Sequence, residues 1–154
     1  MLRWGKKMNA TPGQAVPHVM AQPGDNLILF DGVCNLCTAS VQFIIRHDRR
    51  AVFRFAAIQS DLGREIYRTA GLDPADSRTF LVRTQGRTLI RSDAVLAVAE
   101  QLGGWWRLLA IFKLMPRAWR DWLYALVARR RYAWFRQRDS CMIPSEKVRG
   151  RFLA

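Results

Sequence analysis

The sequence predicts an α/β domain in which strands and helices alternate along most of the 154 residues. Half of the residues are hydrophobic, which is enough for a substantial core and excludes a wholly disordered chain. Short apolar runs of strand length alternate with longer segments whose apolar residues recur at helical spacing. The predicted order of elements is β-α-β-α-β-β-α, followed by two further helices.

Changes in composition divide the chain into four expected regions. Residues 1–25 combine prolines with small polar residues and no periodicity, which indicates a flexible leader. Residues 26–103 hold the alternating elements. Residues 104–144 are expected to be a helical extension packed on them, and residues 145–154 a basic tail.

The first strand and the first helix flank a pair of cysteines. Leu27 to Phe30 is a continuous apolar run that suits a central strand, and Thr38 to Arg49 carries apolar residues at helical spacing. The remaining elements follow from the same patterns and from turn residues: a strand at 51–55, a helix capped by Ser60 and ending near Ala70, strands at 79–83 and 87–90 around Gln85-Gly86, and a helix at 93–101 capped by Ser92.

A right-handed crossover would make the first two strands parallel, and the last two strands form a hairpin. This is the order of a thioredoxin-like domain. The cysteine pair falls where that fold keeps its active site, after the first strand.

Two tryptophan-rich helices are predicted after Gly103-Gly104, at 105–115 and 118–135, separated by Pro116. The second carries an apolar stripe at helical spacing: Trp119, Trp122, Leu123, Leu126 and Val127. Such a pair could lie in a membrane interface, with arginines opposite the tryptophans. We favour a helical hairpin that folds back and closes the core of the small domain, because stripes of this length commonly face a core.

Cys34 and Cys37 have the spacing at which two thiols can close a disulfide within one helical turn. The N–H groups and partial positive charge of a helix N-terminus favour thiolate over thiol. A thiolate attacks a disulfide, and the neighbouring thiol can resolve the mixed disulfide. We expect Cys34 to be exposed and nucleophilic, and Cys37 to be more buried and resolving.

Two other interpretations of the cysteine pair stay open. A structural zinc site usually needs four N or S ligands, and the remaining candidates, Cys141, His18 and His47, form no second close pair. The two cysteines could also be inert buried residues. Cys141 could be a second resolving thiol, a metal ligand or a free thiol, whereas His47 lies too far along its helix to join the cysteines.

Asp31 precedes Cys34 by three residues and has two candidate roles. Its carboxylate could act as the base that takes the proton from Cys37 during resolution. It could instead cap the loop by accepting N–H groups between Gly32 and Cys34, which is common for an Asp-Gly turn after a strand. The cap is the favoured interpretation.

The charge is uneven along the chain. Residues 1–77 contain nine Lys and Arg against seven Asp and Glu, whereas residues 78–154 contain sixteen against five. Such a basic half could meet an anionic membrane surface weakly or an acidic partner, or it could simply be solvated. It contains no recognisable nucleic-acid motif, so sequence-specific nucleic-acid binding is not expected.

The cysteine count and the absence of a signal-like or bilayer-length apolar run predict a cytoplasmic protein. No flavin or nucleotide fingerprint is present, so no cofactor is expected. The pattern does not set an oligomeric state.

The run Asp31-Gly-Val-Cys34-Asn-Leu-Cys37 resembles the Asp-x-x-Cys-x-x-Cys signature of the DCC family of thiol–disulfide oxidoreductases. The likeness extends through later short motifs: Ser92–Val95, Leu114–Pro116, Arg120-Asp121, Tyr124, Arg130–Tyr132 and Cys141–Pro144. The resemblance implies a thioredoxin-like domain and dithiol chemistry on a protein or small-molecule disulfide. It implies Asp31, Cys34 and Cys37 as site residues.

One departure concerns the cis-proline that thioredoxins place before the third strand, facing the cysteines. This chain has Arg78-Thr79 there. Substrate docking by strand addition therefore loses support, and a metal or iron–sulfur role of the cysteines gains some.

Overall fold

A computed structural model describes residues 26–76, 79–137, 139 and 143–153 of the protein. The expected leader and Cys141 lie outside these residues. The strands are β1 (Asn26–Phe30), β2 (Phe53–Ala57), β3 (Leu81–Thr84), β4 (Arg87–Ile90) and β5 (Phe152–Leu153). The helices are α1 (Asn35–His47), α2 (Asp61–Thr69), α3 (Arg91–Leu102), the 3₁₀ helix η1 (Gly104–Leu114), α4 (Arg117–Phe135) and α5 (Glu146–Arg149).

The strands form one mixed sheet in the order β4-β3-β1-β2-β5. Strand β1 pairs in parallel with β2 and antiparallel with β3, and β3 and β4 form the predicted hairpin. All five residues of β1 are buried, as expected for a continuous apolar run at the centre of a sheet. The prediction of a thioredoxin-like α/β fold is confirmed.

The fifth strand is absent from the sequence prediction, which expects residues 145–154 only as a basic tail. They form α5 and then β5, which pairs in parallel with β2. A two-residue strand is too short to show alternation. Its neighbour Arg151 donates from Nε to the carbonyl of Phe53 at 3.0 Å and pairs with the buried Asp48.

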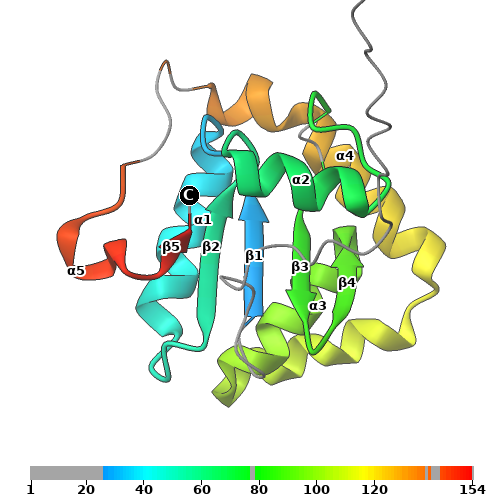
Figure 1. The fold of residues 1–154 in the computed structure, drawn as a ribbon. Coiled ribbons are helices and arrows are strands. Elements are labelled where there is room, and N and C mark those ends of the chain that lie inside the picture. The colour runs from blue at the N-terminus through cyan, green and yellow to red at the C-terminus, as the bar shows by residue number, and fades with distance from the viewer. Residues whose placement is uncertain (1–25, 77–78, 138, 140–142, 154) are drawn as a thin grey trace, which may run out of the picture.

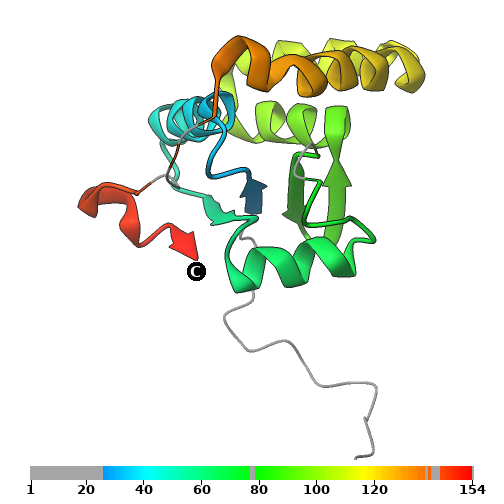
Figure 2. The same ribbon diagram turned by 90° about the horizontal axis from the view of Figure 1, so that it is seen from above.

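Helices cover both faces of the sheet (Figures 1 and 2). Helix α2 packs on one face, where Tyr67 is fully buried, and helices α1 and α3 pack on the other. Helix α4 lies outside α1 and α3 as a further layer, as Figure 2 shows. The N-terminus of α1, which carries the cysteines, therefore lies between the sheet and α4.

The two predicted serine caps have different outcomes. Ser60 caps α2, and its Oγ accepts the N–H of Gly63 at 3.0 Å. The prediction for Ser92 is wrong: the N-cap of α3 is Ile90, and Ser92 lies buried inside the helix. Its hydroxyl bonds Asp121 instead, which links α3 to α4.

The segment after Gly103 forms the predicted helix, but its geometry is 3₁₀. With three residues per turn, Trp105, Leu108, Ile111 and Leu114 follow one another along one side. All four are 66–85% exposed. We call these four residues the outer ridge.

The prediction that the apolar stripe of α4 faces the core is wrong at three of its five positions. Trp119, Trp122 and Leu123 are 55–69% exposed. The inward face is formed by Arg120, Tyr124, Ala128 and Arg131, which recur at intervals of four, four and three residues. Partners inside the protein select this face, because Arg120 and Arg131 both form ion pairs with aspartates of the small domain. Within the described residues, no helix combines the length and the apolar character needed to cross a bilayer.

Candidate functional site at the start of helix α1

Cys34 is the N-cap residue of α1, so the cysteine pair itself forms the first turn of the helix. The N–H of Thr38 bonds the carbonyl of Cys34 at 2.9 Å, and the N–H of Cys37 points at Cys34 Sγ at 3.5 Å. The helix therefore begins three residues before the predicted start at Thr38. The sulfur of Cys34 lies where helix N–H groups favour a negative charge.

The two thiols differ in acidity. The pKa of Cys34 is lowered to about 6, mainly because the Cys37 thiol donates a hydrogen bond to its sulfur. Burial opposes this pKa shift, while the N–H of Cys37 and the positive charge of Arg131 add to it. The pKa of Cys37 is raised, first by that same hydrogen bond, then by burial and by the charge on Cys34. At neutral pH the pair holds a thiolate at Cys34 and a thiol at Cys37.

The expectation that Cys34 is the more exposed thiol is wrong. Cys34 has no exposed surface, whereas Cys37 is half-buried. The segment that follows α4 lies against the cysteine turn. Cys34 forms a β-bridge with Gln137, and the side-chain N–H of Asn35 donates to the carbonyl of Phe135 at 2.7 Å. We call residues 135–137 the strap.

Asp31 is buried and accepts hydrogen bonds at both carboxylate oxygens. Oδ1 accepts the N–H of Val33 at 3.1 Å and the amide of Gln59 at 2.8 Å. The predicted loop cap is confirmed by the Val33 contact. Oδ2 accepts the guanidinium of Arg131 at 3.1 Å and the hydroxyl of Tyr132. Asp31 therefore ties the loop before the cysteines to helix α4.

Arg131 is a site residue that the sequence interpretation missed. Its Nη2 pairs with Asp31, and its Nη1 lies 3.7 Å from Cys37 Sγ, with only 4% of the residue exposed. Burial lowers the pKa of Arg131, but the negative charges that Cys37, Tyr132 and Cys34 carry when ionised outweigh burial and raise it. The guanidinium is thus a fixed cation beside both sulfurs.

The run Arg129-Arg130-Arg131 has the composition of a basic surface, and this obscures the different role of Arg131. Two signals could have identified it. Arg130–Tyr132 is among the motifs of the resemblance, and Arg131 continues the inward spacing that includes Tyr124 and Ala128.

The other candidate ligands do not join the cysteines within the described residues. His47 Nδ1 bonds the carbonyl of Phe43 at 2.8 Å, and its ring packs on Phe43 and Trp106, as its structural role predicted. Cys141 and His18 lie outside the described residues. In the described part of the chain, no three His, Cys, Asp or Glu side chains are grouped as a metal site.

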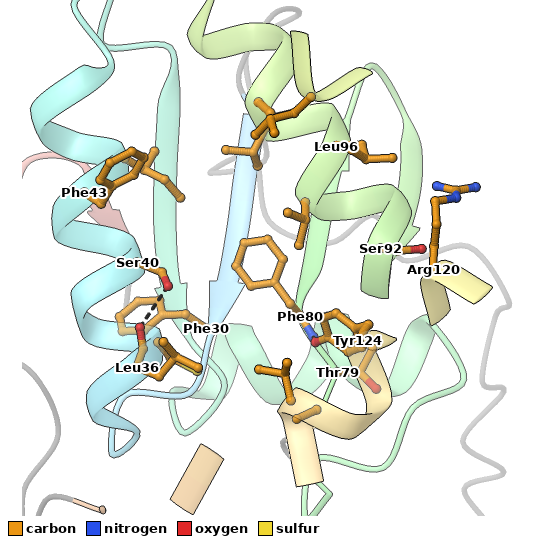
Figure 3. A pocket seen from close by; sticks show the side chains of 18 of the residues that line it. Phe30, Leu36, Ser40, Phe43, Thr79, Phe80, Ser92, Leu96, Arg120 and Tyr124 are labelled. Atoms are coloured by element: carbon orange, nitrogen blue, oxygen red, sulfur yellow. Dashed lines mark hydrogen bonds between the residues drawn. The ribbon is translucent and has the colours of Figure 1, made fainter. Parts of the chain in front are cut away.

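A cavity of about 790 Å³ adjoins the site, between α1, α3, η1 and α4. Cys37, Asp31 and Arg131 form part of its lining, and apolar side chains form most of the rest. Figure 3 shows Leu36 and Phe43 on one side and Leu96 on the other. Tyr124 also lines it: its hydroxyl accepts the N–H of Phe80 at 2.7 Å, and burial raises its pKa to about 12.

Comparison with known proteins identifies the family. The profile described as DCC1-like thiol-disulfide oxidoreductase matches residues 28–137. YuxK of Bacillus subtilis (strain 168), a protein named as uncharacterized, is 37% identical over 129 residues, covering 84% of this chain and 94% of YuxK. A DCC family protein of Arabidopsis thaliana, named as chloroplastic, is 40% identical over 116 residues, covering 75% of this chain and 67% of that protein. No solved structure gave a significant match. The matched region contains the cysteine pair, Asp31 and Arg131, and the chain belongs to the DCC1-like thiol-disulfide oxidoreductase family.

Proposed function

We propose that the protein is a dithiol–disulfide oxidoreductase in which Cys34 attacks the substrate disulfide and Cys37 resolves it. The observation that carries the proposal is the asymmetry of the pair. Cys34 caps a helix with its pKa lowered to about 6, while Cys37, one turn further, has a raised pKa. A nucleophile ionised at neutral pH beside a protonated partner is the starting state that thiol–disulfide exchange requires.

The exchange has two balanced steps. Cys34 Sγ forms a bond to one substrate sulfur, the substrate S–S bond breaks, and the second substrate sulfur leaves as a thiolate that takes a proton from water. Cys37 then gives its proton to water and attacks Cys34 Sγ, which closes the Cys34–Cys37 disulfide and releases the first substrate sulfur as a thiolate. The substrate gains two electrons and the dithiol loses two. A thiol reductant of the cell must return them.

Arg131 supports the second step. Once Cys34 is bonded to substrate it no longer carries the negative charge that raises the pKa of Cys37. The guanidinium 3.7 Å from Cys37 Sγ then favours the Cys37 thiolate. Asp31 holds that guanidinium through its ion pair, so we assign Asp31 a positioning role beside its loop cap.

The test is reduction of a protein disulfide such as that of insulin, with dithiothreitol as electron donor. Cys34→Ser should abolish the protein-dependent rate. Cys37→Ser should accumulate a mixed disulfide between Cys34 and substrate, detectable by mass spectrometry. Full activity of the Cys34→Ser protein, with its fold intact by circular dichroism, would reject the proposal.

We also propose a cytoplasmic location, because a reducing compartment keeps such a pair in the dithiol form. The oxidation state of the cysteine pair, trapped by rapid acid quenching of cells and alkylation, tests this. A pair found mainly as disulfide would contradict it.

A second candidate function, weak attachment to an anionic membrane surface, is favoured by the outer ridge. Four apolar side chains in a row face outward, and the exposed Arg107 and Arg130 lie on the same pair of helices. Tryptophan and apolar side chains flanked by cations suit the interface of an anionic bilayer.

Sedimentation with phosphatidylglycerol-containing vesicles tests this attachment. Binding should fall with added salt and be lost in Leu108→Glu with Ile111→Glu. It should persist in Ile143→Glu, a control at another exposed apolar position, and in Cys34→Ser. Equal binding to neutral phosphatidylcholine vesicles, or no loss in the ridge variant, contradicts the attachment.

A further inference from the structure

The 3₁₀ geometry of η1 gives it a second apolar face. One residue beyond each position of the outer ridge stand Trp106, Leu109, Phe112 and Met115, and all four line the cavity. The helix therefore presents apolar side chains to solvent on one side and to an internal space on the other. The side chains of η1 and α4 do not fill that space, so a cavity remains between these helices and the small domain.

The opposite walls are also hydrocarbon. Leu36 and Phe43 reach in from α1, and Leu96 and Ala99 from α3, with Phe80 between the two helices in Figure 3. The uncharged polar side chains of the lining, apart from the Cys37 thiol, carry hydroxyl groups: Ser40, Thr79, Ser92 and Tyr124. A volume of about 790 Å³ is within the range of small-molecule sites. A cavity with mostly apolar walls binds a ligand mainly through the apolar surface that the ligand buries there.

The charged groups of the lining are already paired with one another or with neighbours. Arg120 bonds Asp93 at 3.0 Å, and Arg131 bonds Asp31 at 3.1 Å. A charged ligand would have to lose its hydration in an apolar space where these ion pairs already balance the fixed charges. The lining therefore selects for a molecule without net charge.

The cavity is open to solvent at its rim. Six apolar side chains of its lining keep 36–55% of their surface exposed: Phe43, Val95, Phe112, Met115, Leu123 and Val127. Cys37 forms part of the wall, so a molecule that fills the cavity would lie against a thiol of the site.

We propose that this cavity is a binding site for a neutral, lipophilic small molecule, which when bound lies against Cys37. The inference goes beyond the dithiol chemistry, and its binding step is measurable in a protein without the nucleophile. Failure of the redox proposal and failure of this one are therefore separate results.

The probe for the test is N-phenyl-1-naphthylamine, a neutral apolar dye whose emission rises in hydrocarbon surroundings. We expect saturable binding to the Cys34→Ser protein. Ala128→Phe, which adds a ring to the cavity wall, should weaken binding about tenfold or more. Ala118→Phe is the matched control: it lies on the exposed side of the same helix, outside the cavity lining, and should bind as the parent does.

If Ala128→Phe does not fold, Ala39→Phe replaces it, because Ala39 lines the cavity from α1 but is itself exposed. A second readout follows Cys37 in the Cys34→Ser protein. The bound dye should slow alkylation of Cys37 by N-ethylmaleimide several-fold, with the modified cysteine identified by peptide mass spectrometry.

Four outcomes overturn the proposal. These are equal dye binding in the Ala128→Phe and Ala118→Phe proteins, no saturable binding, unprotected Cys37 at saturating dye, and tighter binding of an anionic dye such as dansyl undecanoate. Tighter binding of the anionic dye would mean that the cavity recognises charge. Equal binding in the Ala128→Phe and Ala118→Phe proteins would mean that the outer ridge, and not the cavity, holds the dye.

Discussion

The two halves of the thiol site differ in how far apart along the chain their residues lie. Cys34 and Cys37 share one helical turn with the loop that Asp31 caps. Arg131 and Tyr132 come from α4, about 100 residues away, and meet the same carboxylate. The local half creates the thiolate through hydrogen bonds, and the remote half supplies a buried cation. The motif therefore makes the largest contribution to the ionisation of Cys34, and Arg131 of α4 acts on both sulfurs.

The largest expected effect comes from removing the carboxylate that joins the halves. Asp31→Ala removes the carboxylate that pairs with the buried Arg131, which should cost about 3–5 kcal/mol of unfolding free energy. Urea unfolding measures it. Asp31→Ala with Arg131→Met should lose less than the sum of the single variants, and an additive result would show that the two residues are energetically independent.

The next largest effect comes from removing the cation that the remote half supplies. Arg131→Met removes the cation, so the pKa of Cys34 should rise from about 6 and resolution by Cys37 should slow about tenfold. The rate of iodoacetamide alkylation as a function of pH measures the pKa of Cys34. The rate at which substrate is released from the mixed disulfide measures resolution by Cys37. Arg130→Met, at the exposed neighbouring position, should change neither.

The local half predicts its own pH dependence. Because the pKa of Cys34 is depressed, its thiolate persists at neutral pH and is lost as the pH falls through about 6. Cys37→Ala removes the thiol that donates the strongest hydrogen bond, so the alkylation midpoint of Cys34 should move upward toward that of an ordinary cysteine. An unchanged midpoint would mean that the helix N–H groups and the charge of Arg131 account for the acidity without the Cys37 thiol.

Access to Cys34 depends on the strap. Asn35→Ala removes the hydrogen bond to the Phe135 carbonyl, which is worth about 0.5–1.5 kcal/mol. Alkylation of Cys34 at fixed pH should therefore quicken by up to about tenfold without a shift of its pH midpoint. Gln42→Ala on the same helix serves as a control. A rate change of equal size in that variant would mean that the strap does not control access to Cys34.

The smallest effect concerns backbone strain within the strap. Arg136 has φ 58° and ψ 161°, a region that is favourable for glycine alone among the common residues. Arg136→Gly should raise the unfolding free energy by about 1 kcal/mol, measured by urea unfolding. A loss of stability would show that the arginine side chain outweighs the strain.

Much of the local half follows from sequence. The apolar run of β1, the Ser60 cap and the Gln85-Gly86 turn each have a short-range physical cause, and the structure contains all three. The position of the cysteine pair at a helix start also follows from short-range sequence signals. The catalytic assignment of Cys34, Cys37 and Asp31 stays a prediction until the variants are measured.

The remote half does not follow, because it depends on which face of α4 turns inward. The apolar stripe containing Trp119 suggests one rotation of the helix, and the ion pairs of Arg120 and Arg131 impose another. For η1 the difference between 3.0 and 3.6 residues per turn decides which residues point out. Neither a helix rotation nor a 3₁₀ repeat is readable from hydrophobicity alone.

The strap has a mechanical consequence for catalysis. Phe135 ends α4, and Arg131 lies one helical turn before it, so the two are parts of one rigid rod. Any motion of that rod that uncovers Cys34 for an incoming disulfide also shifts the guanidinium beside Cys37. Exposing Cys34 and changing the electrostatic surroundings of Cys37 would then be one movement.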